Sequence, residues 1–235
     1  MRVTLVDFTQ NAEHKMIFTK STRLQMEPGL MHKIYEMSNE EIVEELEYMA
    51  NTIPSSWEFC NYSFLIEGVS RAFTHQFVRN RQGSYAQQTM RILNVSGFDY
   101  ITGPTIQSNT RNSALYKSCM DYIQDTYDKL VENGASIEDA RGLLPTNICT
   151  NIVAKFNLRT LSEVMSARSS SRTQGEYREV IEEMYKRVIE VHPWAHLFLN
   201  SKKKQAANKL DAAIQAWGGE DTTDLIKQID ILRKG

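Results

Sequence analysis

The stretch that decides the fold reads IEGVSRAFTHQFVRNRQGSYAQQTMR and covers residues 66–91. Apolar side chains recur at helical spacing in residues 70–78, which predicts a helix there. Arg79 and Arg81 lie two positions apart, so on a continuing helix they would not share a face. A helix that ends near Val78 instead places both arginines at the start of the next loop, where they can converge on one ligand.

Positive charge is concentrated around this loop. Residues 68–98 contain four arginines and neither Asp nor Glu, although the net charge of the whole chain is only −2. Those arginines are Arg71, Arg79, Arg81 and Arg91. Without carboxylates the segment keeps a positive potential, and the planar guanidinium fork binds two phosphate oxygens at once. The pattern favours a phosphorylated ligand; the alternative is a solvated surface loop.

Composition limits the class of protein. The 235 residues are 41% hydrophobic and 24% charged, which is typical of a soluble globular protein with a packed core. No apolar run has the length of about 18 residues that a membrane helix needs, and the N-terminus lacks a signal peptide's apolar centre. We expect a cytoplasmic protein with no membrane partner. The small net charge provides no broad basic surface for a nucleic acid polymer.

Cysteine and histidine spacing predicts no metal site. Cys60, Cys119 and Cys149 are far apart and form no CxxC pair, so we expect reduced, mostly buried thiols. His192 and His196 have i, i+4 spacing, but Pro193 and Trp194 intervene. No glycine-rich nucleotide motif is present either, so any nucleotide would be bound by other means.

The remaining pattern predicts an α+β fold, with helices around a central antiparallel sheet and a helical C-terminal tail. Strands are expected at residues 2–8, 62–69, 89–95 and 146–156. One helix is expected within residues 37–54, capped by Ser38 or Asn39 and ended before Pro54. Other helices are expected at residues 70–78, 113–133, 137–144, 158–168 and 175–192. We expect one domain over residues 1–200 and a polar helical extension over residues 201–235.

Two further polar groups stand out. Arg141 lies in ARGLLP, where it is a candidate partner for the carbonyls that end a short helix. NLRTLSEVMSARSSSRTQGEYR, residues 157–178, holds Asn157, Arg159 and Arg168; the alternative is a helix end whose Arg and Ser residues cap carbonyls.

Taken together and in order, these three segments resemble the signature and the two later motifs of the flavin-dependent thymidylate synthases. The likeness runs from about Ser55 to about His192. It implies a homotetramer with shared active sites, FAD as cofactor, and NADPH and methylenetetrahydrofolate as co-substrates. The substrate would be a pyrimidine deoxynucleotide monophosphate, dUMP, methylated at C5 to dTMP.

The resemblance also assigns residues. FAD would be bound by Ser55, Glu58, Arg79, Asn80, Arg81, Asn157, Arg159 and Glu163. The nucleotide would be bound by Gln76, Gln87, Thr89, Arg91, Arg141 and Arg168. The residues assigned to catalysis are Arg168, Asn80 and Thr89. Arg168 would lie beside the base and stabilise the charge that develops on its ring carbonyls.

Three positions depart from the family pattern. Asn80 replaces a histidine, Thr89 replaces a serine, and Arg172 replaces a later histidine. An imidazole can stack and titrate, whereas an amide only forms hydrogen bonds. Two alternatives to a thymidylate synthase therefore stay open. One is a flavin- and folate-dependent 5-hydroxymethylase acting on dUMP or dCMP, and the other is a non-catalytic nucleotide-binding relative.

Overall fold

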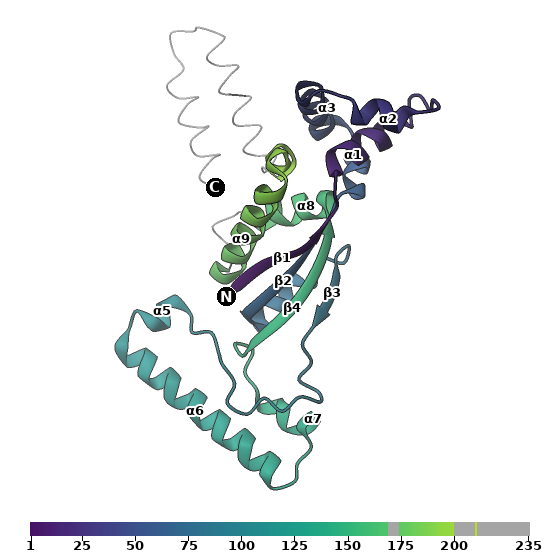
Figure 1. Cartoon of the computed structure of the whole chain (residues 1–235). Helices are drawn as coiled ribbons and strands as arrows, with labels where there is room; N and C mark the ends of the chain where they lie inside the picture. The colour runs from purple at the N-terminus through teal and green to yellow at the C-terminus, as the bar shows by residue number, and fades with distance from the viewer. Residues whose placement is uncertain (169–173, 200–209, 211–235) are drawn as a thin grey trace, which may run out of the picture. The chain divides into compact units, whose positions relative to one another are not determined.

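The central strands show how an alternating sequence builds the sheet. In the computed structural model, which describes residues 1–168, 174–199 and 210, β2 (Asn61–Ser70) and β4 (Cys149–Asn157) bury alternate side chains over most of their length. Such alternation packs one face of a strand against apolar neighbours. The sheet is antiparallel, with the order β1-β2-β4-β3, and its outer strands are β1 (Arg2–Phe8) and β3 (Ser84–Gln87) (Figure 1).

Helices make up most of the remaining described chain and confirm the α+β class. The α-helices are α1 (Ala12–Ser21), α2 (Leu30–Tyr35), α3 (Asn39–Thr52), α4 (Arg71–Phe77), α5 (Pro104–Gln107), α6 (Thr110–Glu132), α7 (Ile137–Ala140), α8 (Leu158–Arg168), α9 (Gly175–Val191) and α10 (His196–Leu199). Short 3-10 helices are η1 (Pro54–Phe59), η2 (Arg141–Leu143) and η3 (Pro193–Ala195). The helices expected at residues 70–78 and 158–168 are confirmed within one residue at each end, and the helix expected within residues 37–54 is confirmed as α3.

The chain divides into two compact units. Unit 1 comprises Met1–Val3 and Leu65–Ala154, and unit 2 comprises Thr4–Phe64 and Lys155–Gly235. The expected C-terminal extension lies outside the described residues apart from Leu210, and so does Arg172.

Unit 1 combines α4 with a helical arm. On α4, Phe73 and Phe77 are fully buried and their rings stack 4.9 Å apart. The helix begins at Ser70, whose hydroxyl accepts a hydrogen bond from the Phe73 amide. The arm consists of α6 with α5 and α7 against it (Figure 1). After α6 the chain turns at Gly134, whose φ of +91° favours glycine.

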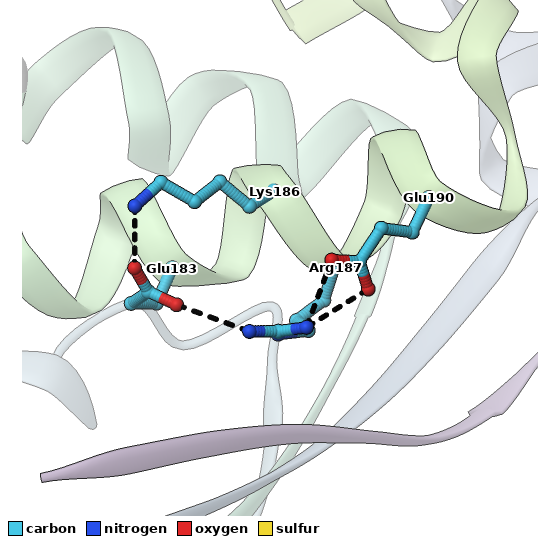
Figure 2. A network of polar contacts seen from close by, with 4 residues as sticks. All are labelled: Glu183, Lys186, Arg187 and Glu190. Carbon is cyan, nitrogen blue, oxygen red and sulfur yellow. Dashed lines mark hydrogen bonds and ion pairs between the residues drawn. The ribbon is translucent and has the colours of Figure 1, made fainter.

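Unit 2 packs α1, α3 and α8 around η1. The start of α3 is fixed by a capping box, in which Ser38 and Glu41 each bind the other's backbone amide. Helix α9 has a buried face, while its outer face carries ion pairs three and four residues apart among Glu183, Lys186, Arg187 and Glu190 (Figure 2). Such exposed pairs add little stability.

The strand expected at residues 89–95 is wrong. The chain forms β3 at Ser84–Gln87 instead, and the Gln88 amide still donates to the Asn151 carbonyl before the pairing ends. The expectation rested on apolar residues that the structure leaves exposed: Ile92 is 72% exposed and Leu93 is 43% exposed. Hydrophobic alternation predicts a strand only where one face is buried, and here neither side chain has that environment.

Among the described residues, no helix has both the length and the apolar character needed to cross a membrane.

Candidate active site

In unit 1, two of the expected phosphate-binding arginines meet at one carboxylate. The Nε of Arg91 lies 3.2 Å from Oε1 of Glu138, and a terminal nitrogen of Arg141 lies 3.7 Å from the same oxygen. Arg141 also donates from Nε to the backbone carbonyl of Glu138, at 3.1 Å. The short helix α7, capped by Ser136, places Glu138 on the turn before Arg141. Residues distant in sequence therefore form one polar group.

A third arginine belongs to this group. Burial lowers the pKa of the Arg71 guanidinium, and the nearby positive charge of Arg141 lowers it further. Arg71 also donates to the backbone carbonyl of Gln88, at 3.4 Å. We call Arg71, Arg91, Arg141 and Glu138 the arginine cluster. Its guanidiniums give this part of unit 1 the charge to bind a phosphate.

The loop after α4 is tied to the end of that helix. Asn80 donates from Nδ2 to the Phe77 carbonyl at 2.8 Å, and the Tyr85 hydroxyl lies 2.8 Å from the Asn80 carbonyl. Arg79 and Arg81 are exposed in this loop, as expected for a helix that ends at Phe77. The loop therefore presents both guanidiniums to solvent.

The neutral donors and acceptors assigned to the nucleotide also lie in unit 1. Gln87 donates to the Thr74 hydroxyl at 2.8 Å, which links β3 to α4. The Thr89 hydroxyl accepts from the Arg91 amide at 3.1 Å. Gln76 lies on α4 and is partly buried. Thr89 thus has a local role in shaping the turn that carries Arg91.

In unit 2, Arg159 joins two of the acids assigned to FAD. Its Nη1 lies 2.8 Å from Oε1 of Glu58, and its Nε lies 3.4 Å from Oε1 of Glu163. The hydrogen bond that Arg159 donates to Glu58, with the charges of both acids, raises the pKa of Arg159. All three side chains are partly exposed, so a ligand can reach them.

Two more assigned residues lie in unit 2. Asn157 accepts a hydrogen bond on Oδ1 from the Thr160 amide, at 2.8 Å, and thereby caps α8. The Ser55 hydroxyl accepts a hydrogen bond from Arg23, which lies just after α1. Arg168, at the end of α8, lies over the ring of Tyr177 with 4.8 Å to its centroid.

A cavity of about 410 Å³ lies beside Arg159 and Glu163 in unit 2. Trp57, Pro54 and Ala50 contribute apolar lining, and Arg159 and Glu163 contribute charge. Trp57 is itself held in place, because its indole nitrogen donates to the Met49 carbonyl at 3.1 Å. An aromatic wall next to charged donors is typical of small-molecule sites.

The environment of Cys60 does not favour a nucleophilic thiolate. Burial raises the pKa of the Cys60 thiol to about 12, so it stays protonated at neutral pH. The expectation of mostly buried thiols is wrong, because Cys119 is exposed on the outer face of α6 and Cys149 is only partly buried. Within residues 1–168, 174–199 and 210, no group of three or more His, Cys, Asp or Glu side chains could hold a metal ion.

Sequence reasoning missed three residues of these groups. Glu138 lies outside the acid-free segment in sequence yet contacts Arg91, so the cluster is not free of acids in space. Arg71 was counted among the arginines but given no role, and Arg23 was not considered. The i, i+3 spacing of Glu138 and Arg141 is a local signal for that pair. The contacts of Glu138 with Arg91 and of Arg23 with Ser55 have no such signal, since they join distant segments.

Comparison with known proteins finds one matching family and several similar enzymes. The model of a family described as thymidylate synthase complementing protein matches residues 4–194. A flavin-dependent thymidylate synthase of Clostridium tetani is 30% identical, covering 82% of this chain and 84% of the relative. Enzymes of the same name from Sulfurisphaera tokodaii and Saccharolobus solfataricus are 33% and 32% identical, over 82% and 81% of this chain and 75% and 74% of each relative.

Proposed function

Because the chain belongs to the flavin-dependent thymidylate synthase family, we propose that it transfers one carbon from methylenetetrahydrofolate to C5 of dUMP. The product is dTMP, and NADPH is the reductant. The relatives carry enzyme names, which favours catalysis over a purely nucleotide-binding role.

The observation that carries this proposal is the meeting of Arg91 and Arg141 at one anionic oxygen. Two guanidiniums directed at the same oxygen can neutralise and hydrogen-bond a phosphate monoester, which has a charge of about −1.5 to −2 at neutral pH. In the proposed complex they bind the dUMP phosphate, while Thr89, Gln76 and Gln87 supply neutral hydrogen-bonding groups.

Arg168 has the role of binding the base. Its contact with Tyr177 leaves a guanidinium that can donate to ring carbonyls. Negative charge on those carbonyls makes C5 nucleophilic toward the carbon donor, and a positioned cation stabilises that charge before the new bond forms. No cysteine nucleophile is needed for this step, consistent with the protonated state of Cys60.

The groups assigned to FAD fit such a ligand chemically. The cations for a pyrophosphate come from Arg79, Arg81 and Arg159. Neutral hydrogen-bonding groups come from Ser55 and Asn157. The carboxylates of Glu58 and Glu163 can accept hydrogen bonds from ribose or adenine. The cavity beside Trp57 offers an apolar surface for a ring. When bound, reduced FAD would supply the hydride equivalent that brings the transferred carbon to the methyl level.

We further propose a homotetramer with shared active sites in the cytoplasm. Loop arginines as exposed as Arg79 and Arg81 cannot alone exclude water from a bound flavin. Light scattering tests the assembly: a tetramer is expected, and an active monomer of about the 27.0 kDa chain mass would exclude it.

A second product is favoured by Asn80. This residue stands where the family pattern has histidine, and its amide is bonded to a helix carbonyl. A smaller amide leaves more room for water than an imidazole does. Hydration of the transferred carbon, in place of reduction, would give a 5-hydroxymethyl nucleotide from dUMP or dCMP.

Product mass decides between these functions. The full-length protein is incubated with FAD, NADPH, methylenetetrahydrofolate and either dUMP or dCMP. A mass equal to dTMP from dUMP supports the synthase, and a hydroxymethylated product supports the alternative. Absence of any new nucleotide, with flavin bound, would contradict both.

A further inference from the structure

The carboxylate of Glu138 lies where the two arginines of the proposed phosphate site converge. Its Oε1 is 3.2 Å from Nε of Arg91 and 3.7 Å from a terminal nitrogen of Arg141. One oxygen of a side chain therefore contacts both guanidiniums, as one oxygen of a phosphate could.

The local charges explain why a carboxylate is needed there. Arg71 and Arg141 are close enough for the positive charge of one to lower the pKa of the other. Adding Arg91 gives three guanidiniums in one group, and like charges repel. Glu138, which contacts Arg91 and Arg141, offsets part of that repulsion.

The same carboxylate would oppose a bound phosphate. A phosphate dianion and Glu138 cannot share the position between the guanidiniums, because both are negative and both need the same donors. The side chain of Glu138 is 52% exposed, so it has solvent to move into. Arg141 keeps a second anchor, from its Nε to the Glu138 backbone carbonyl, whichever way the side chain turns.

We propose that Glu138 is a resident counterion that occupies the phosphate position in the nucleotide-free protein and is displaced by the incoming phosphate. The proposal rests on the proposed function, since it takes the arginine cluster as the nucleotide's phosphate site. It makes Glu138 a residue that sets substrate affinity: binding exchanges one anion for another, and the affinity reflects the difference.

The test is calorimetric titration of the full-length protein and its Glu138→Gln variant with dUMP, deoxyuridine and inorganic phosphate. Glutamine keeps the shape and removes the charge that competes. Loss of two partly exposed ion pairs should tighten dUMP and phosphate binding by about 2- to 30-fold, with deoxyuridine unchanged. Asp121→Asn is the matched control, because Asp121 is paired with Lys117 on α6 and its loss changes net charge equally.

Each result separates the possibilities. Equal or weaker binding of dUMP and phosphate by Glu138→Gln would overturn the proposal, since Glu138 would then hold the arginines in place for the ligand. An equal gain in Asp121→Asn would also overturn it, by showing a general charge effect. If dUMP binds to neither protein but phosphate binds more tightly to Glu138→Gln, the proposed function fails while the counterion exchange stands.

Discussion

The side-chain amide of Asn80 donates a hydrogen bond to the backbone carbonyl of Phe77, 2.8 Å away, and so closes the end of α4. Tyr85 reinforces this turn, because its hydroxyl lies 3.2 Å from the Phe77 carbonyl and 2.8 Å from the Asn80 carbonyl. The position that the family pattern gives to a histidine is therefore part of the loop that presents Arg79 and Arg81.

Replacing Asn80 by His tests whether this position sets the product. An imidazole fills more space than the amide and leaves less room for water at the transferred carbon. We expect the ratio of dTMP to hydroxymethylated nucleotide, or the rate of dTMP formation, to rise in Asn80→His. The measurement is product mass under identical conditions for both proteins. An identical ratio and rate would show that Asn80 is a neutral substitution.

Arg81 is expected to contribute to flavin binding through a charge-assisted hydrogen bond. Its replacement by Ala should weaken FAD binding by about 1.5–3 kcal/mol. Retained flavin absorbance after dialysis, or fluorescence titration, measures the effect. Arg111→Ala is the control, since Arg111 is also exposed in unit 1 but lies in the first turn of α6. Unchanged flavin retention in Arg81→Ala would count against this assignment.

A substitution at Arg159 tests whether its contacts with Glu58 and Glu163 matter for FAD binding. Its Nη1 and Nε contact Glu58 and Glu163 at the same time, and the single ammonium of lysine cannot reproduce that fork. We expect Arg159→Lys to lower FAD affinity by about tenfold, the loss of one modest hydrogen bond.

Arg187 provides a matched control for that change. It also contacts two glutamates, Glu183 and Glu190, but on the outer face of α9 (Figure 2). Arg187→Lys should leave FAD affinity unchanged. A similar loss in both variants would mean that Arg159 acts through general stability and not through the cofactor.

Local signals in the sequence predicted much of the fold. Ser38 or Asn39 was expected to cap a helix, and Ser38 does so in a capping box with Glu41. The helix of residues 158–168 was also predicted correctly, because its apolar spacing and its capping residue Asn157 are contained within one short window. These features depend on neighbours in the chain, so the sequence alone reveals them.

Contacts between distant segments could not be predicted in the same way. Glu138 meets Arg91 only because α7 and the segment after β3 fold together within unit 1, and Arg23 meets Ser55 only because α1 packs on η1. The wrong prediction of a strand at residues 89–95 has the same cause. The apolar residues of this segment stay exposed, and a local pattern cannot show whether the fold offers a surface to bury them.

A buried histidine gives unit 2 a predictable response to acid. The His192 ring is buried; its Nδ1 lies 2.9 Å from the Tyr62 hydroxyl, and Trp194 stacks on it. Burial lowers the pKa of His192 below its ordinary value of 6.5, and the charge of Glu13 opposes this only in part. The folded protein therefore binds this proton less readily than the unfolded chain does.

Stability should consequently fall as the pH falls below about 6.5. Above that pH His192 is neutral in both the folded and the unfolded protein, and the full stability is present. As the pH falls from about 6.5 toward the lower pKa of the folded state, only the unfolded chain binds the proton, and stability is lost. His192→Asn keeps an acceptor for Tyr62 but removes the titration, so its melting temperature should fall less between pH 7.5 and 5.5 (both about one unit from the ordinary pKa). His32→Asn, at a residue whose side chain is 80% exposed, should follow the wild type. Parallel melting curves for wild type and His192→Asn across this range would show that His192 does not cause the acid sensitivity.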